Sequence, residues 1–290
     1  MQIAIHLGAH RTDGDLILET LQRNEGILSG HRVAVPPPRR ARPAIRRAAQ
    51  AAGGGGFSSE AQDELLVEML GEAADPRRLV LSYEAFLGIY AKVLDGGRLY
   101  GDAGARARLL RDLFPDHEPA FFLAIRNPAT FVPAVFEAST VGTLAEFTGG
   151  HDLGGLRWTD VVRSIRAACP DVPLTVWCNE DLPLLLPTVL EAVSGVEERL
   201  DGDDAVLERV MTEPGLRRLR TYLRDNPPGT RSTWRKVVTA FLGKYADPEV
   251  VEPPITTAGW TDALVAQLTA TYEDDVRALQ ELPGITFLRP

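Results

Sequence analysis

The sequence predicts an α/β protein whose parallel sheet is flanked by helices. Short apolar runs typical of buried strands alternate with segments whose apolar residues recur at helical spacing. Strands that alternate with helices in this way form parallel sheets that are covered on both faces. The 290 residues suffice for one sizeable core, so we expect a single domain over 1–290, in which about 197–255 could form a helical appendage.

The chain opens with a predicted strand, loop and helix. Residues 2–8 form a short apolar run typical of a buried strand. Residues 15–28 follow with Leu and Ile at helical spacing, which indicates one apolar helix face. A second strand is expected at 32–38, and its three closing prolines end it because proline cannot donate to a sheet.

The next segment, 39–57, is rich in Arg, Ala and Gly and gives the weakest structural pattern in the chain. A helix is expected at 59–73, because Ser59 is a suitable N-cap and the leucines that follow lie on one face. A third strand is expected at 78–84, where the apolar run "RLVLSYE" stands.

Two further helix–strand pairs are expected to complete the sheet, since each amphipathic segment leads into a β-rich run. The pairs are 103–114 with 119–128 and 158–170 with 172–182. From about 197 onwards the pattern is mainly helical, up to a last strand at 284–290.

Composition excludes several classes of protein. A formal net charge of -9 and a pI near 5.2 argue against a nucleic-acid or anionic-membrane binder, because such surfaces carry excess Lys and Arg. Cys169 and Cys178 are too few for a disulfide framework, so free thiols in a reducing cytoplasm are expected. No histidine pair lies at i, i+4 on a predicted helix, because His6 and His10 belong to the first strand and its loop, and we expect no metal. Without a leader or a long apolar run, a soluble cytoplasmic protein is expected.

Polar residues follow four of the predicted strands. Ligands of an open parallel sheet bind beyond the carboxyl ends of its strands, so these residues are the candidates for a site. They are the loop 8–15, Ser82 to Glu84, Arg126 to Pro128, and Asn179 to Asp181.

The loop 8–15 joins a strand to a helix, where backbone amides and the helix N-terminus can hold a phosphate. The nucleotide-binding form of such a loop is G-x-x-x-x-G-K-[ST]. Here five residues separate Gly8 from Gly14, no Lys precedes the helix, and Asp15 stands in place of Ser or Thr. An ATP- or GTP-dependent phosphoryl transfer with magnesium is therefore disfavoured.

The segment 6–21 resembles the 5′-phosphosulfate loop of bacterial sulfotransferases, H-x-G-x-x-K-T-G-T-T followed by a Leu-rich helix. Arg11 stands for the family's Lys, whereas Asp13 and Asp15 stand where Gly and Thr are expected. Later segments resemble that family in the same order, namely "LVLSYEAF", "AIRNPATFVPAVFEAS", "WTDVVRSIRAACPDVPLTVWCNEDLP" and "YEDDVRALQELPGITFLRP". The resemblance covers most of 1–195 and the last 30 residues, and implies a P-loop NTPase/sulfotransferase-like fold with additional C-terminal helices.

The resemblance implies sulfuryl transfer from 3′-phosphoadenosine 5′-phosphosulfate to a hydroxyl or amine of a small-molecule or glycan acceptor. It implies Arg11 as the cation on the leaving phosphate and Arg126 as a ligand of the 3′-phosphate, although a strand-end Arg also fits a capping or salt-bridge role. The family's partner Ser is Ala134 here, and Ser139 lies about one helical turn beyond it. The implied donor-binding residues are Gly8, Ala9, His10, Arg11, Thr12, Asp13, Gly14, Asp15, Arg126 and Ser139.

Two residues are candidates for contact with the acceptor. Glu84, after the third strand, is the candidate general base, although a surface or helix-capping carboxylate has the same pattern. His10 could contact the acceptor from the loop, whereas His6 fits a histidine with satisfied hydrogen bonds. Ser82 is placed like Glu84 but has no evident His partner.

The two loop aspartates bear most on the function. Asp13 can cap the following helix and Asp15 can stabilise its first turn, and either carboxylate could occupy or repel an anion site. At about 4 Å, two unit charges repel by roughly 1 kcal/mol in water and about 4 kcal/mol at an effective dielectric of 20. We therefore expect replacement of both by Gly and Thr to tighten donor binding, if their carboxylates face the anion.

Other charged segments have simple interpretations. Asn179–Asp181 fits a carboxylate that caps the following helix, and Asp274 and Asp275 fit a solvated helix face. The arginines at 39–47 are typical of a solvated helix or loop, but they could also attract a sulfated or acidic acceptor or partner. These arginines are Arg39, Arg40, Arg42, Arg46 and Arg47. The glycine run 53–56 is typical of a linker or of the hinge of a lid.

Two functions of different classes follow from the sequence. The first is a sulfotransferase-like enzyme, weak or altered by its unusual loop. The second is a non-catalytic binding or scaffold protein, a pseudoenzyme that keeps the fold after losing its donor site. Affinity for 3′-phosphoadenosine 5′-phosphate separates them.

Overall fold

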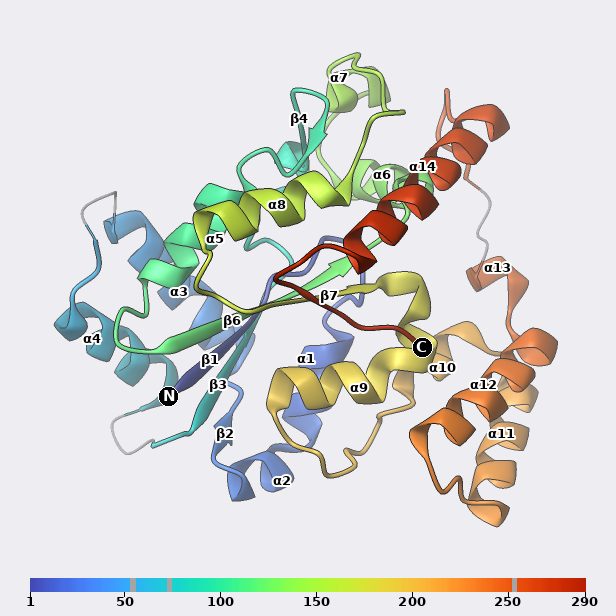
Figure 1. The fold of residues 1–290 in the computed structure, drawn as a ribbon, viewed down its shortest axis with the longest axis horizontal. Coiled ribbons are helices and arrows are strands. Elements are labelled where there is room, and N and C mark those ends of the chain that lie inside the picture. Colours follow the sequence, from blue (N-terminus) through green and yellow to red (C-terminus); the bar gives the residue numbers. More distant parts are fainter. Residues whose placement is uncertain (53–55, 72–74, 252–254) are drawn as a thin grey trace.

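The computed structural model describes residues 1–52, 56–71, 75–251 and 255–290. Its centre is a six-stranded, wholly parallel sheet with the strand order β2-β3-β1-β6-β7-β8 (Figure 1). The strands are β1 (Gln2–His6), β2 (Val33–Ala34), β3 (Arg78–Ser82), β6 (Glu118–Ile125), β7 (Leu174–Cys178) and β8 (Thr286–Phe287). The predicted α/β architecture with a parallel sheet flanked by helices is confirmed.

Helices cover both faces of the sheet, and each face has its own apolar core. One face packs against α3 (Pro38–Ala52), α4 (Ser59–Leu70), α5 (Ala103–Asp112), α6 (Pro128–Ala138), α8 (Trp158–Ala168) and α14 (Asp262–Gln280). The opposite face packs against α1 (Leu16–Arg23), α2 (Glu25–Gly30), α9 (Leu182–Ser194), α10 (Ala205–Val210), α11 (Glu213–Asp225) and α12 (Arg231–Tyr245). Alternate residues of β1 serve the two cores, since Ile3 and Ile5 face the first and Ala4 faces the second.

Short elements complete the chain. They are the 3-10 turns η1 (Tyr90–Lys92) and η2 (Asn179–Asp181), the antiparallel pair β4 (Leu94–Asp95) and β5 (Arg98–Leu99), and the helices α7 (Leu144–Thr148) and α13 (Pro248–Val251). Among the residues that the structure describes, no helix is long and apolar enough to cross a membrane.

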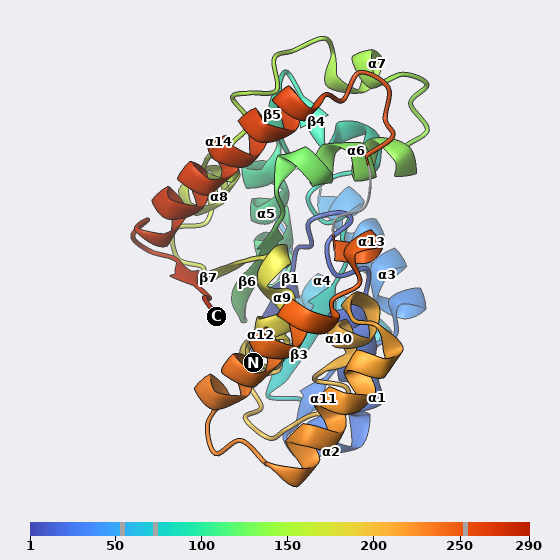
Figure 2. The same cartoon turned by 90° about the vertical axis from the view of Figure 1, so that its right-hand side faces the viewer.

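The predicted helical appendage corresponds to α10, α11, α12 and α13. Its apolar residues Leu207, Leu219 and Val238 belong to the same core as α1 and α9, so these helices extend one face of the sheet. Figure 2 shows α11 and α12 together, well apart from α14, which returns the chain to the sheet at β8.

Two local predictions needed correction. The helix expected at 15–28 is two helices that meet at Asn24, and the N-cap of α4 is Ser58 rather than Ser59, because the Ser58 side chain accepts a hydrogen bond from the Ala61 amide. The Arg-rich segment forms helix α3 through Pro43. Of the predicted glycine hinge, residues 53–55 lie outside the described residues.

Candidate functional site

The loop between β1 and α1 lies at the carboxyl edge of the sheet, between the ends of β3 and β6. The Ala124 amide of β6 donates to the Gly8 carbonyl at 2.8 Å, which fixes the start of the loop. Gly8 has a φ of +93°, and a Cβ added there would lie 2.9 Å from the Cα of Glu84. Only glycine therefore fits this position, and its fit brings Glu84 against the loop.

The Tyr100 side chain holds the middle of the loop through hydrogen bonds to His10. The Tyr100 hydroxyl accepts from the His10 amide at 3.0 Å and lies 2.8 Å from His10 Nδ1. A neutral His10 ring whose Nδ1 carries no proton can accept the Tyr100 hydroxyl proton. Burial lowers the pKa of His10, which also favours that neutral ring.

His10 is therefore a support of the loop in this structure. Its side chain is 0 % exposed and its ring packs edge-on against Tyr90, so an acceptor in solvent does not reach it. His10 was expected to contact the acceptor from the loop. In the structure it lies in the loop, but its side chain is buried.

The carboxylates of the two loop aspartates accept hydrogen bonds from groups other than the amides in the middle of the loop. Asp13 Oδ2 accepts from the Ile17 amide in the first turn of α1 at 3.1 Å. The N-cap residue, however, is Asp15 rather than the expected Asp13, and its side chain bonds no amide of that turn. Asp15 Oδ1 accepts from Arg42 Nη2 at 2.6 Å, and the Arg42 guanidinium also lies over the Tyr83 ring. The Arg42 side chain of α3 thus neutralises one of the two carboxylates.

Four consecutive amides of the loop remain open. Within the described ranges, the amide nitrogens of Thr12, Asp13, Gly14 and Asp15 donate no hydrogen bond to another residue. They directly precede α1, whose N-terminus carries a partial positive charge. Amides without a partner at a helix start are the groups that bind phosphate and sulfate oxygens, so the loop is a candidate anion cradle.

Glu84 lies beside this cradle. Its Oε2 accepts from the Arg11 amide at 3.3 Å and its Oε1 accepts from the Tyr90 hydroxyl at 2.9 Å. Burial and the Glu84 carboxylate raise the pKa of Tyr90 to about 12, so Tyr90 stays protonated and donates at neutral pH. The sequence did not identify Tyr90, which belongs to η1.

Arg126, at the end of β6, also contacts the loop. Its Nη1 donates to the Arg11 carbonyl and its Nε donates to Thr130 Oγ1 at 3.1 Å. Burial lowers the pKa of Arg126, but a guanidinium keeps its charge at neutral pH. The Trp158 indole donates to the Arg126 carbonyl at 2.8 Å and fixes the strand end.

Ser139 is not brought to the same place. Its hydroxyl donates to the Phe136 carbonyl at 2.7 Å and accepts from the Val141 amide, at the C-terminal end of α6. Arg126 precedes the other end of this 11-residue helix, about 16 Å away at 1.5 Å per residue. Ser139 therefore ends α6 and does not join Arg126 in a phosphate site.

Ser82 has a histidine partner that the sequence did not suggest. Its hydroxyl lies 2.9 Å from His6 Nδ1, because the parallel register of β1 and β3 pairs these two residues. His6 is buried against the Trp177 ring, and burial lowers its pKa. The pair stiffens the sheet beneath the loop.

Two acidic segments differ from the predictions. Glu180 does not cap the helix that follows it; its Oε1 accepts from the Asn127 amide at the start of α6, at 2.7 Å, and its Oε2 accepts from the Tyr272 hydroxyl. Asp275 is buried rather than solvated, because its Oδ2 accepts from the Trp158 amide at 2.6 Å and caps α8. Asp274 is exposed and pairs with Arg277, as expected for a solvated face.

One basic residue of the site had no signal in the sequence. Arg209 of α10 donates from Nη1 to the Asp13 carbonyl at 2.8 Å, across 196 positions of the chain. No local pattern marks such a contact, which arises only from the packing of α10 against α1 and α9.

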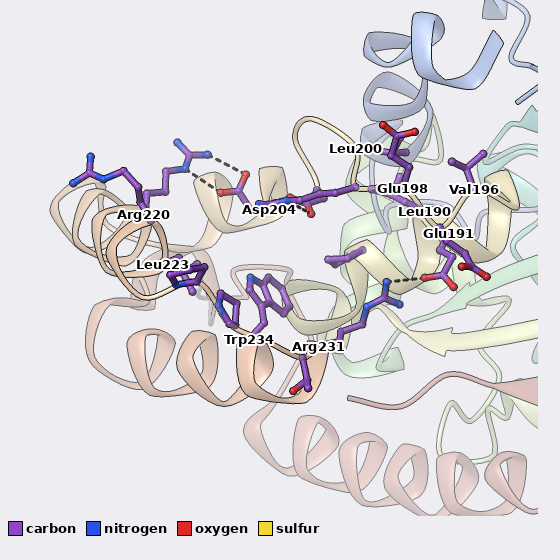
Figure 3. A pocket seen from close by; sticks show the side chains of 18 residues that line it. Leu190, Glu191, Val196, Glu198, Leu200, Asp204, Arg220, Leu223, Arg231 and Trp234 are labelled. Atoms are coloured by element: carbon purple, nitrogen blue, oxygen red, sulfur yellow. Dashed lines mark hydrogen bonds and ion pairs between the residues drawn. The ribbon is translucent and has the colours of Figure 1, made fainter. Parts of the chain in front are cut away.

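Several cavities lie away from the loop. One of about 580 Å³ lies between α9, α11 and α12, with Trp234 at its wall (Figure 3). Its arginines are held in ion pairs, such as Arg220 with Asp204 and Arg231 with Glu191. Such paired cations offer little attraction for a multiply charged anion.

The chain was compared with protein-family models, curated proteins and solved structures, and none of them matches it. In the described part of the chain, no three His, Cys, Asp or Glu side chains are grouped as metal ligands.

Proposed function

We propose that the chain is a sulfotransferase-like protein that binds 3′-phosphoadenosine 5′-phosphosulfate at the loop 8–15. The acceptor is a hydroxyl or amine of a small molecule or glycan. The observation that carries the proposal is the set of four open amides from Thr12 to Asp15, because both nearby carboxylates are bonded elsewhere. The central β1 followed by this loop and α1 supports a P-loop type of fold.

Each residue of the site has a role in this proposal. The open amides and the exposed Arg11 side chain stabilise the leaving 5′-phosphate, and the free edge of Arg126 faces the donor's 3′-phosphate. The acceptor atom bonds to sulfur while the bond from sulfur to the phosphate oxygen breaks. Glu84 takes the acceptor's proton, and the displaced phosphate keeps the electron pair. The donor supplies the activated sulfuryl group.

A non-catalytic binding or scaffold protein is the second candidate. One observation favours it: four cavities of about 410 to 620 Å³ are lined by none of the residues 8–15, so none of these four gives the loop a preformed space for a nucleotide. The Glu84 carboxylate also stands beside the cradle. Such a protein would bind the donor weakly or not at all.

Titration with 3′-phosphoadenosine 5′-phosphate by calorimetry separates the two. We expect micromolar affinity for the wild type and a loss of about 10- to 100-fold in Arg11→Ala, since a hydrogen bond to a charged group contributes about 1.5 to 3 kcal/mol. Arg217→Ala, which removes an exposed arginine of α11, controls for the change in net charge. Millimolar or absent binding to the wild type would reject the enzyme and favour the second candidate.

A further inference from the structure

Two arginines from outside the loop hold alternate carbonyls within it. Arg126, at the end of β6, donates to the carbonyl of Arg11, and Arg209 of α10 donates to the carbonyl of Asp13. The Arg209 guanidinium lies against the next residue as well, since its Nη1 is 3.7 Å from a Cβ placed on Gly14. The loop is thus gripped at two carbonyls, two residues apart.

Because the peptide group is planar, a hydrogen bond that fixes the orientation of a carbonyl also fixes the orientation of the amide that follows it. In a trans peptide the C=O of one residue and the N–H of the next point in opposite directions. The bonds after Arg11 and Asp13 are both trans. A guanidinium that holds the Arg11 carbonyl therefore turns the Thr12 amide away from Arg126, and one that holds the Asp13 carbonyl turns the Gly14 amide away from Arg209.

These two amides belong to the four that are open. Alternate amides that are turned away from their carbonyl partners form a concave site for an oxyanion, and left-handed residues such as Gly14 and Asp15 favour this shape. The carbonyl oxygens, which would repel an anion, face guanidinium groups instead.

We propose that Arg209 is a positioning residue of the anion cradle, by which the helical appendage fixes the amide of Gly14 for a phosphate- or sulfate-type oxyanion. Arg126 does the same for the amide of Thr12. The inference rests on the proposed function only in naming the donor's 5′-phosphate as that oxyanion. It adds a role for α10 that neither the loop motif nor the sheet supplies.

The test uses the full chain and two probes, inorganic pyrophosphate and 3′-phosphoadenosine 5′-phosphate, each titrated by calorimetry. Arg209→Met keeps the aliphatic stem but removes the donors, and we expect about tenfold weaker binding of both probes. Arg209→Lys restores one donor and should recover most of the affinity. The melting temperature of each variant is measured alongside, and Arg217→Ala is the control for net charge.

A positioning role persists in 0.5 M salt, whereas attraction between a distant guanidinium and the anion is screened there. The proposal is overturned if Arg209→Met binds both probes like the wild type, whatever its melting temperature, or if its deficit disappears in high salt. Wild-type binding of pyrophosphate alone, with a deficit in Arg209→Met, supports the inference and rejects the proposed function. Equal binding of 3′-phosphoadenosine 5′-phosphate by the wild type and by Arg209→Met supports the proposed function and rejects the inference. A wild type that binds neither probe rejects both.

Discussion

Replacement of Gly8 with alanine is expected to lower the stability of the protein by about 2 to 4 kcal/mol and to disturb the contact between the loop and Glu84. A φ of +93° is unfavourable for any residue with a Cβ. The new methyl would also lie 2.9 Å from Glu84 Cα and 3.2 Å from its carbonyl oxygen, and backbone atoms at a strand end cannot easily move. Thermal unfolding measures the first effect and calorimetry with 3′-phosphoadenosine 5′-phosphate measures the second.

Gly71 offers a matched control for this substitution. Its φ is +90°, but among the described residues a Cβ added there meets no atom within 4 Å. Gly71→Ala therefore measures the conformational cost alone, about 1 to 2 kcal/mol. If Gly8→Ala were no more destabilising than Gly71→Ala, the close approach between the loop and β3 would not hold in solution.

The second large effect concerns Glu84 as the base. We expect Glu84→Gln to reduce the rate of sulfuryl transfer by at least about 100-fold, because the amide cannot take the acceptor's proton. The side chain keeps its size, and its amide oxygen can still accept from the Arg11 amide, so the loop should stay in place. Release of 3′-phosphoadenosine 5′-phosphate from the donor, with phenols, sugars and amines as acceptors, measures the rate.

Glu19→Gln, on the exposed face of α1, is the control with the same change in charge. Binding of 3′-phosphoadenosine 5′-phosphate should differ by less than about threefold between the two variants, well under 1.4 kcal/mol. An active Glu84→Gln protein would remove the base from the mechanism, even if the donor site were intact.

Apolar periodicity sufficed to predict the sheet. Strands β1, β6 and β7 are buried on both faces and therefore have apolar runs that need no knowledge of the rest of the chain. The break between α1 and α2 could not be predicted in that way. The Asn24 side chain donates to the carbonyl of Asp201 and accepts from its amide, and this contact spans 177 positions.

The meeting of the loop with Glu84 and Arg126 was also predictable, because carboxyl ends of parallel strands share one edge of the sheet. The loop, Glu84 and Arg126 were expected there and do meet. The role of each residue depended on tertiary contacts that the sequence does not contain. Tyr100 buries His10, and Arg42 neutralises Asp15.

Some missed features were within reach of the sequence. Pairing of His6 with Ser82 follows from the register of two predicted strands, which align without a shift at their carboxyl ends. The capping role of Asp275 was not within reach, because it joins α14 to the first turn of α8, 117 positions earlier. A polar residue within a helical pattern is expected to be exposed to solvent, and only the packing of the folded chain shows that it is buried.

The central claim is that the amides of Thr12 to Asp15 receive the donor's 5′-phosphate. Amide ¹H–¹⁵N spectra of the wild-type protein during titration with 3′-phosphoadenosine 5′-phosphate test it most directly. We expect saturable shifts of these four amides, together with the side chain of Arg11. Shifts confined to the cavity between α9, α11 and α12, or none at all, would contradict it.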